Sequence, residues 1–450
     1  MSRFTAGQVQ EALALPDAPR AAEFSGVSTD TRTIGPGELF VALVGERFDG
    51  HAYLEVARDR GAIAAIVRRD TPSVSGLELL EVDDTLRAYG DLARARRRTL
   101  IGPVVCVTGN NGKTTTKEMV AAALRTRWRT HATRANNNNL VGVPLTILEA
   151  PDDVEALVIE GGGNVPGELP RYREIVEPDV TVATNATEGH LEGYGTLEAI
   201  VADTVAVAAG VPLAVVGVEP PSLAAGARHA ARRTISVGWA GADRRPDVIG
   251  HDALARPRVR LGGHEVQLPL PGRHQALNAL FAWVVAESLG LEPARVAEAL
   301  AQVTVPGGRS ELLQEGGLTI LNDCYNANPH SFGTAIATAA ELRKGRRLVF
   351  VAGTMRELGD DAEALHLEVA ERIVALDPEL VAAVGEFVPA FAPHAARLGD
   401  RLVSAPDAPA MGLLLAARLA GDEVVVLKGS RGAALERILP AVLGRTVSPH

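Results

Sequence analysis

Residues 108–119, TGNNGKTTTKEM, come directly after the apolar run PVVCV and lead into the helical pattern MVAAALRTRW. A glycine turn between a strand and a helix gathers free backbone N–H groups at the positive end of the helix dipole, and together these bind phosphate. Lys113 can then reach the β- and γ-phosphates of a nucleotide, and a hydroxyl from Thr114 or Thr115 suits Mg²⁺. The segment therefore predicts a phosphate-binding loop whose turn consists of Gly109, Asn110, Asn111 and Gly112.

An ordinary strand–turn–helix connection is the alternative, because Val107 stands where the full Walker spacing has a glycine. Lysine usage favours the phosphate site. The chain has 45 basic residues, yet lysine is found only at positions 113, 117, 344 and 428. In a chain that otherwise uses arginine, each lysine invites a chemical explanation, although chance or surface placement would explain Lys117 and Lys344.

Length and composition bound the class of protein. A chain of 450 residues is expected to form two or three domains, and a net charge of −10 argues against nucleic acid or an anionic membrane as the main partner. Two cysteines are too few for a disulfide framework or a cysteine metal site. Residues 1–16 lack the apolar core of a secretory signal, and the most apolar window, residues 200–218, contains Asp203 and a Gly-Val-Pro break. We expect a cytoplasmic monomer with no integral membrane segment and no nucleic-acid partner.

Alternating strand and helix patterns divide the chain into three α/β domains. Residues 1–98 predict a small N-terminal domain that ends in a connecting helix, residues 83–98, with a basic and solvated face. Residues 99–305 predict a central doubly wound, mostly parallel sheet, which includes an amphipathic helix at 274–290. A Pro-Gly-Gly linker then opens a second α/β set over residues 306–450.

Polar residues at strand ends of the central domain are candidates for metal and substrate binding. Glu160 ends the strand pattern ALVIE before three glycines, and His190 follows the strand pattern VTVATNA. Carboxyl ends of parallel strands meet at one sheet edge, so both would lie beside the phosphate loop and could hold Mg²⁺. A solvated carboxylate and a structural histidine are the alternatives. Residues 136–139, NNNN, offer uncharged amides to a peptide or sugar through Asn136, Asn138 and Asn139, or form an exposed capping turn.

The third domain carries polar strand ends of its own. The segment LNDCYNANPHS follows a strand pattern, and LKGSRGAALERI reads as another strand–turn–helix anion site. Any one of these segments could be a loop cap, but several polar strand ends in one domain suggest a ligand face. The candidate residues are Arg309, Asp323, Tyr325, Asn326, Asn328, Lys428, Ser430 and Arg431.

Taken together, these motifs resemble the Mur ligases, the ATP-dependent amide-forming enzymes of peptidoglycan synthesis. The resemblance covers nearly the whole chain, in the family's order. Its motifs are STDTR, GERFDGHAY, TGNNGKTTTKEM, NNNNLVGVPLTIL, GGGNVPGEL, GHLEGYGTLE, GRHQALNAL, DCYNANPHS, GTMRELGDD and LKGSRG. YNANP with a downstream ELG, and no Asp-Asn-Pro-Arg stretch, resembles the member that joins D-alanyl-D-alanine to UDP-N-acetylmuramoyl-tripeptide.

The resemblance implies a role for each domain. The N-terminal domain would bind the uridine-nucleotide end of the substrate, the central domain ATP and Mg²⁺, and the Rossmann-like C-terminal domain the incoming D-alanyl-D-alanine. His274 and Asn278 would lie near the adenine, and Arg309 and Asp323 near the ribose and phosphates. The residues implied for the uridine-nucleotide end are Ser28, Asp30, Arg32, Asp49, Gly50 and His51.

The reaction implied is amide formation through an acyl phosphate. A substrate carboxylate attacks the γ-phosphate of ATP and releases ADP, and the dipeptide amine then displaces phosphate through a tetrahedral intermediate. The protein contributes mainly positioning and charge neutralisation to such a reaction, by Lys113, Mg²⁺ and domain closure.

The chain departs from the family's pattern around the metal site. Thr204 occupies the position of the carbamylated lysine that helps most Mur ligases to hold a second Mg²⁺, and Val165 and Thr354 replace a histidine and an aspartate. Asp203, Glu188 and Glu192 are candidate substitute carboxylates, with Asp203 the first. Each could equally lie on a solvated face or cap a helix, and an extra water could complete the second metal's shell instead. Three hypotheses follow: an active ligase with a lysine-free metal site, a catalytically impaired paralogue that binds nucleotide and precursor as a regulatory subunit, or a related ligase with another amino-acid substrate.

Overall fold

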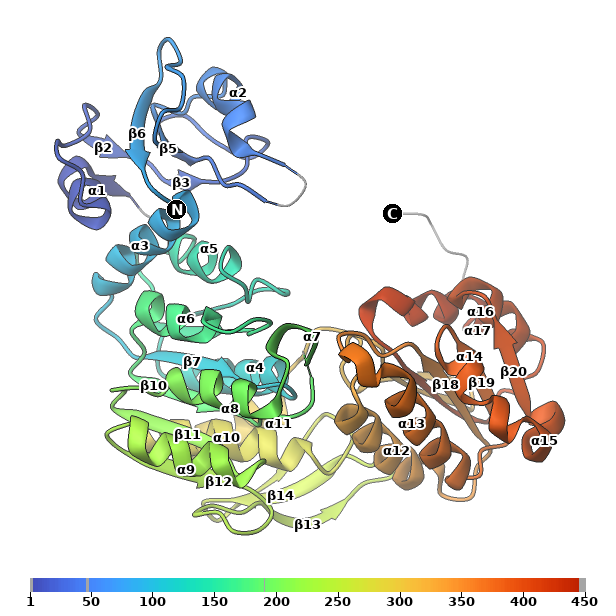
Figure 1. Cartoon of the computed structure of the whole chain (residues 1–450). Coiled ribbons are helices and arrows are strands. Elements are labelled where there is room, and N and C mark those ends of the chain that lie inside the picture. Colours follow the sequence, from blue (N-terminus) through green and yellow to red (C-terminus); the bar gives the residue numbers. More distant parts are fainter. Residues whose placement is uncertain (1–2, 46–47, 190, 445–450) are drawn as a thin grey trace.

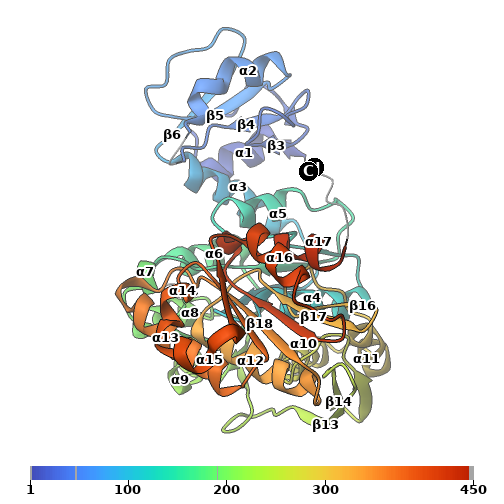
Figure 2. The ribbon, with the colours of Figure 1, turned by 90° about the vertical axis from the view of Figure 1, so that its right-hand side faces the viewer.

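A computed structural model describes residues 3–45, 48–189 and 191–444. The chain folds into three α/β units, of which the first and the third both adjoin the second and stand apart from each other (Figure 1; Figure 2). The predicted α/β class with mostly parallel sheets is confirmed. The predicted domain limits at 98/99 and 305/306 stay predictions. No helix among the described residues is long and apolar enough to cross a membrane.

The N-terminal unit is built on a four-stranded parallel sheet in the order β3-β4-β5-β6. Its sheet strands are β3 (Val27–Ser28), β4 (Leu39–Val41), β5 (Ala64–Arg68) and β6 (Glu78–Val82), beside the pair β1 (Phe4–Thr5) and β2 (Glu23–Phe24). Its helices are α1 (Ala6–Leu13), α2 (Leu54–Asp59) and α3 (Thr85–Arg98).

The central unit is a six-stranded parallel sheet in the order β12-β11-β10-β7-β9-β8. The strands are β7 (Val104–Thr108), β8 (Thr130–Ala132), β9 (Ala156–Glu160), β10 (Val180–Ala183), β11 (Leu213–Gly217) and β12 (Thr234–Val237). One face packs on α4 (Lys113–Arg125), α10 (Gln275–Ser288) and α11 (Pro293–Ala301). The other packs on α5 (Gly142–Leu148), α6 (Glu168–Val176), α8 (Leu197–Ala206) and α9 (Pro221–Ala230). The short helix α7 (Leu191–Tyr194) precedes α8.

Helix α10 is not amphipathic, contrary to the prediction from its sequence. Its residues from Ala279 to Ala286 are buried without interruption. A small antiparallel sheet covers the side that α4 leaves free, and it consists of β13 (Asp247–His251), β14 (Pro257–Leu261) and β15 (His264–Gln267). The helix is therefore enclosed between two sheets, and it needs no polar face.

The C-terminal unit is a six-stranded sheet in the order β16-β17-β21-β18-β19-β20, in which only the β16–β17 pair is antiparallel. The strands are β16 (Glu311–Glu315), β17 (Leu318–Asp323), β18 (Leu348–Gly353), β19 (Leu380–Val384), β20 (Leu402–Ala405) and β21 (Val424–Lys428). Helices α12 (Pro329–Arg343), α13 (Ala362–Ala375) and α14 (Phe387–Ala390) cover one face. Helices α16 (Ala408–Ala416) and α17 (Leu439–Val442) cover the other, and α15 (Ala395–Leu398) lies before β20.

Helix α3 belongs to the packing of two units, and its basic end is not a solvated face as predicted. One hydrophobic core contains Tyr89 and Leu92 of α3 together with Ile147 of α5 and Ile175 of α6. Arg97 is buried, because its guanidinium closes the end of α6: Nε donates to the carbonyl of Val176 at 2.9 Å, and Nη2 to that of Glu177 at 2.8 Å. The N-terminal unit is thereby fixed to the central one by a continuous core.

We expect Arg97→Met to lower the free energy of unfolding by about 2–3 kcal/mol, because it leaves buried carbonyl groups without donors. Arg98→Met is the matched control. Arg98 pairs with Glu177 from an exposed position, so its loss should cost less than about 1 kcal/mol. Urea unfolding of both variants measures the difference, and equal effects would show that the buried contacts of Arg97 do not stabilise the interface.

Candidate active site

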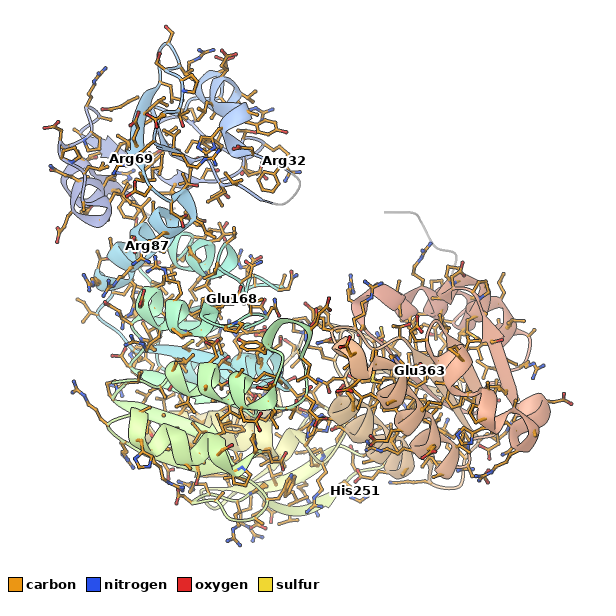
Figure 3. The ribbon with its side chains drawn as sticks, viewed as in Figure 1. Arg32, Arg69, Arg87, Glu168, His251 and Glu363 are labelled. Carbon is orange, nitrogen blue, oxygen red and sulfur yellow. The ribbon has the colours of Figure 1, made fainter. Side chains whose placement is uncertain are left out.

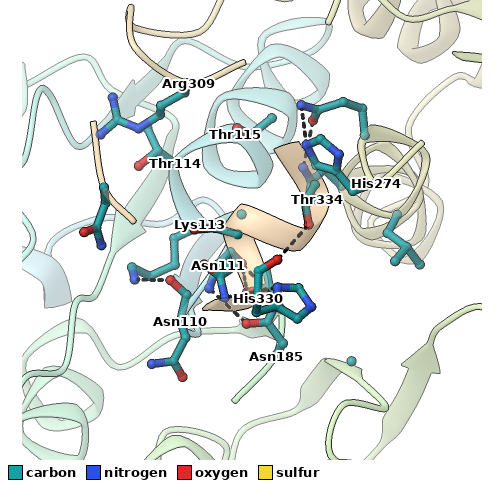
Figure 4. A pocket seen from close by; sticks show the side chains of 18 of the residues that line it. Asn110, Asn111, Lys113, Thr114, Thr115, Asn185, His274, Arg309, His330 and Thr334 are labelled. Carbon is teal, nitrogen blue, oxygen red and sulfur yellow. Dashed lines mark hydrogen bonds between the residues drawn. The ribbon is translucent and has the colours of Figure 1, made fainter. Parts of the chain in front are cut away.

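A pocket of about 380 Å³ lies where the carboxyl ends of the central strands face the C-terminal unit (Figure 4). The structure brings together in it most of the residues predicted for ATP, metal and dipeptide. Those that line it are Asn110, Asn111, Gly112, Lys113, Thr114, Thr115, Asn138, Glu160, His274, Asn278, Arg309, Asp323, Asn326 and Lys428. Residues far apart in the sequence therefore form one site between two units.

The predicted phosphate loop connects β7 to α4. Gly109 and Gly112 have φ values of 123° and 78°, which L-residues rarely adopt, and a Cβ at Gly109 would collide with Thr184. Gly112 caps α4, so the first N–H groups of this 13-residue helix open towards the pocket. The loop has the backbone form that phosphate binding requires.

The ammonium group of Lys113 lies at the loop and donates to the carbonyl of Asn110 at 3.2 Å. Burial lowers the pKa of Lys113, while the carboxylates of Glu160 and Glu357 act to raise it and the guanidinium of Arg309 to lower it. A partly desolvated cation beside a second cation gains most from an anionic ligand.

Glu160 ends β9 with its side chain inside the pocket, and the residue is 1% exposed. Its Oε1 accepts from the hydroxyl of Thr114 at 3.1 Å and from the amide of Asn138 at 2.9 Å. Its Oε2 is buried and accepts no hydrogen bond from the described residues. A buried carboxylate oxygen without a donor suits a hard cation, so Glu160 and Thr114 fit Mg²⁺.

The third predicted metal ligand, His190, lies outside the described residues. Within the described part of the chain, no three His, Cys, Asp or Glu residues are grouped so that they could hold a metal ion. Mg²⁺ is commonly bound by one or two protein ligands together with phosphate oxygens and water, which matches this arrangement.

Asp203, the first candidate for a substitute metal ligand, is already engaged elsewhere. Its carboxylate accepts from the N–H of Gly167 and the hydroxyl of Tyr194, both at 2.8 Å, and from the N–H of Leu169 at 3.4 Å. It ties α8 to the start of α6 and does not line the pocket. The structure thus contradicts the expectation for Asp203, since its oxygens serve local backbone groups.

Thr204 is buried on α8, and its hydroxyl donates to the carbonyl of Ile200 at 2.7 Å. Glu188 and Glu192 are exposed and do not line the pocket.

Threonine stands at position 204, so no lysine carbamate can form there. We therefore expect ligase activity that is unchanged when dissolved CO₂ is removed. Initial rates in degassed and bicarbonate-supplemented buffer test this, and stimulation by bicarbonate would contradict it.

His274 and Asn278 differ in how many of their side-chain polar atoms already have hydrogen-bond partners. Burial lowers the pKa of His274 to about 4, so the imidazole is neutral at pH 7, and its Nδ1 has no hydrogen-bond partner among the described residues. Asn278 is engaged at both ends of its amide: the oxygen accepts from Thr116 at 3.2 Å, and the nitrogen donates to Gln275 at 2.8 Å. His274 can therefore bind a ligand directly, whereas Asn278 supports the phosphate loop from below.

In the C-terminal unit, the predicted residues mainly organise the loop after β17. Lys428 forms an ion pair with Asp323 at 2.9 Å and donates to the carbonyl of Asn326 at 2.6 Å. Asn328 caps α12 and also donates to the side chain of Asn111 at 3.0 Å, which links this loop to the phosphate loop. Lys428 and Asn328 thus shape the site through other residues.

Ser430 and Arg431 do not line the pocket. Ser430 is buried, and its hydroxyl accepts from the N–H of Arg356 at 3.1 Å. Arg431 lies at the surface, 3.6 Å from Glu436. Their predicted contact with substrate stays a prediction.

The residues predicted for the uridine nucleotide lie in the N-terminal unit, apart from the pocket, as the position of Arg32 shows (Figure 3). Ser28 ends β3, and its hydroxyl accepts at 3.2 Å from the N–H of Asp30 in the loop that follows. The hydrogen bond from Arg32 lowers the pKa of Asp30. Asp49 accepts a hydrogen bond from the backbone N–H of His51 at 3.0 Å, and this bond lowers the pKa of Asp49.

Three further predicted residues are Gly50, Asn136 and Asn139, of which Gly50 begins a short 3-10 helix. Gly50 of the N-terminal unit is buried so closely against residues 42–43 that a Cβ would reach their backbone at 2.8 Å. In the asparagine run of the central unit, Asn136 is exposed, and Asn139 accepts from the N–H groups of Val141 and Gly142. Asn136 and Asn139 thus lie outside the pocket that Asn138 lines.

Sequence reasoning missed Asn185 and His330. Asn185 accepts from the N–H of Asn111 at 2.9 Å and returns a bond to its carbonyl at 3.1 Å, so it braces the phosphate loop. His330 lies 3.6 Å from Glu219 and lowers the pKa of that carboxyl. Asn185 lies in the segment VTVATNA, which precedes the predicted His190, and His330 lies in LNDCYNANPHS, which carries other predicted site residues. The partner of each, Asn111 and Glu219, comes from a different strand end or a different unit, so the sequence does not reveal these contacts.

Three family models match the chain: the Mur ligase family catalytic domain over residues 23–97, the Mur ligase middle domain over 107–286 and the Mur ligase glutamate ligase domain over 308–431. The UDP-N-acetylmuramoyl-tripeptide–D-alanyl-D-alanine ligase of Bacillus subtilis is 36% identical over 349 residues, which cover 76% of each chain.

Two solved structures agree over most of the chain. A crystal structure of MurF from Acinetobacter baumannii has a TM-score of 0.88 and 28% identity, and it covers 99% of this chain and 100% of its own. That of MurF ligase from Thermotoga maritima in complex with ADP has a TM-score of 0.83 and 28% identity, over 93% of this chain and 97% of its own.

The chain belongs to the Mur ligase family. Within that family it is similar to the MurF ligases, in sequence and in the arrangement of all three units.

Proposed function

We propose that this chain is the ATP-dependent ligase that joins D-alanyl-D-alanine to UDP-N-acetylmuramoyl-tripeptide, with ADP and phosphate as products. The observation that carries the proposal is the pocket between the central and C-terminal units, where a glycine-permitted phosphate loop meets a buried carboxylate with a free oxygen. The names of the relatives supply the two substrates.

The residues divide the work as follows. The loop N–H groups, Lys113 and Arg309 bind the phosphates of ATP and hold the γ-phosphate towards the substrate carboxylate. Thr114 and Glu160, together with His190, hold Mg²⁺. When bound, Mg²⁺ neutralises charge on the phosphate that is transferred.

The other predicted residues position the remaining groups. Neutral His274 faces the base, and the end of β17 places Asp323 at the ribose. The N-terminal residues, from Ser28 to His51, bind the uridine nucleotide. Because these residues stand apart from the pocket, the N-terminal and C-terminal units must approach each other before the carboxylate and ATP can react. We place the reaction in the cytoplasm, where ATP is available.

The impaired-paralogue hypothesis is not favoured, because relatives named as this ligase match most of the chain in sequence and in structure. A coupled assay decides between them. The purified chain is given ATP, Mg²⁺, D-alanyl-D-alanine and the tripeptide precursor, with meso-diaminopimelate or L-lysine as its third residue. We expect ADP release that depends on both peptide substrates, and a pentapeptide product by mass spectrometry. Nucleotide binding with no product from either precursor would sink the proposal. Product formed when another amino acid or dipeptide replaces D-alanyl-D-alanine, and not with D-alanyl-D-alanine, would favour the related ligase.

A further inference from the structure

Arg309 is the least engaged charged side chain that lines the pocket. Its guanidinium makes no hydrogen bond and no ion pair with any described residue, and the residue is half-buried. Two carboxylates near it, Glu311 in the sequence and Asp323 at the end of β17, already have partners. Glu311 accepts from Gly308 at 3.0 Å and from Asn322 at 2.7 Å, and Asp323 pairs with Lys428 at 2.9 Å. Its donors are therefore available to a ligand in the pocket.

A long arginine side chain without partners would ordinarily move among many rotamers, at an entropic cost for any ligand that must order it. Here one contact restrains it: the guanidinium carbon of Arg309 lies 3.5 Å from the ring centroid of Tyr325. Arginine stacks on aromatic faces through both its charge and its planar shape, which leaves the N–H groups at its edge free to donate.

The backbone on both sides of Arg309 is tied to the same loop as Tyr325. The N–H of Tyr325 donates to the carbonyl of Gly308 at 3.0 Å, and the N–H of Ser310 donates to Asp323 at 2.9 Å. Gly308 has a φ of 76°, and a Cβ there would touch the Cβ of Tyr325 at 3.5 Å. The linker between the two units is thus held against the loop after β17, with the arginine laid over the ring.

We propose that Tyr325 is a positioning residue, which holds the guanidinium of Arg309 in the pocket so that its N–H groups meet the phosphates of the nucleotide. The inference rests on the proposed function, because it takes Arg309 as a phosphate-binding residue. It extends that function to Tyr325, which lines the same pocket, and it makes phosphate affinity depend on the contact between the linker and the C-terminal unit.

The ring, not the hydroxyl, carries the effect. The hydroxyl of Tyr325 makes no hydrogen bond with any described residue, whereas the ring is the surface that Arg309 covers. Tyr325→Phe keeps this surface, Tyr325→Leu keeps apolar bulk without an aromatic face, and Tyr325→Ala removes both. We expect the affinity for ADP to be unchanged in the Phe variant and to fall about tenfold in the Ala variant, with the Leu variant between them.

The experiment measures ADP, AMP and adenosine binding with Mg²⁺ by calorimetry, in these variants and in Arg309→Ala. The loss in Tyr325→Ala should be large for ADP and absent for adenosine, because the guanidinium acts on phosphates. In the Arg309→Ala background, Tyr325→Ala should weaken ADP binding by less than about twofold. Thermal unfolding of each variant reports whether the fold is kept.

Three results would overturn the inference. If Tyr325→Ala lowers ADP affinity tenfold even without Arg309, the ring contacts the nucleotide itself. If it lowers adenosine affinity equally, the substitution distorts the site in general. If Tyr325→Ala binds ADP with full affinity, the stacking does not contribute to binding. The ligase reaction is judged separately, since a wild-type chain that binds ADP but forms no product would refute the proposed function while the binding cycle still tests Tyr325.

Discussion

Lys113→Ala should abolish ligation, with kcat/KM at least a hundredfold to a thousandfold below the wild-type value and the fold intact. Lys113 is the cation at the start of α4, where the phosphates of ATP are proposed to lie. Loss of one donor that stabilises developing charge costs about 3–4 kcal/mol in the transition state. The same coupled assay, followed at saturating Mg²⁺, measures the loss.

Lys344→Ala provides the matched control for this substitution. Lys344 follows α12, donates to the carbonyl of Asp252 at an exposed site and lies outside the pocket. Its variant should retain wild-type activity. Equal activity of the Lys113 variant and this control would remove the phosphate role from the loop.

The part of the site at the carboxyl ends of the central strands could be predicted from the sequence, because parallel strands end at the same edge of a sheet regardless of loop conformation. A glycine turn after β7 and a carboxylate at the end of β9 necessarily meet at one edge. Gly109, Lys113 and Glu160 follow from this rule alone, with no knowledge of helix packing.

The remaining features depend on which surfaces meet, and sequence patterns do not record this. Asp203 stands next to Thr204, the position of the family's lysine, but its carboxylate accepts a hydrogen bond from the backbone N–H of Gly167. The sequence predicts a solvated charge at Arg97, but in the fold its guanidinium donates to the free carbonyl groups at the end of α6. The small sheet β13–β15 makes α10 a buried helix, although its sequence has the spacing of an amphipathic one. In each case a tertiary partner overrode a local preference.

The contact between the central and C-terminal units is polar, whereas the contact between the N-terminal and central units is apolar. Asn328 bonds to Asn111, and His330 faces Glu219. Among the described residues of the central unit, only Ala255 joins a hydrophobic core of the C-terminal unit. Polar contacts of this kind are easily exchanged for water, so the C-terminal unit is the one that we expect to move when nucleotide binds.

Glu160→Gln should reduce kcat by about two to three orders of magnitude and raise the Mg²⁺ concentration needed for half-maximal activity. The amide keeps the size of the side chain and can still accept from Thr114, so the fold and the loop should be kept. What it removes is the negative charge on Oε2, the buried oxygen that lacks a donor and suits a divalent cation. Mg²⁺ titrations of activity and of ADP binding measure both effects.

A second carboxylate of the same domain shows whether the effect belongs to the site. Glu149 is exposed at the end of α5, so Glu149→Gln should leave the Mg²⁺ dependence as in the wild-type chain. Glu160→Gln should also weaken ADP binding only when Mg²⁺ is present, because the carboxylate acts through the metal. If it weakened binding equally in EDTA, or left the Mg²⁺ titration unshifted, Glu160 would be a structural acceptor for Thr114 and Asn138, and the metal would have to be held by other groups.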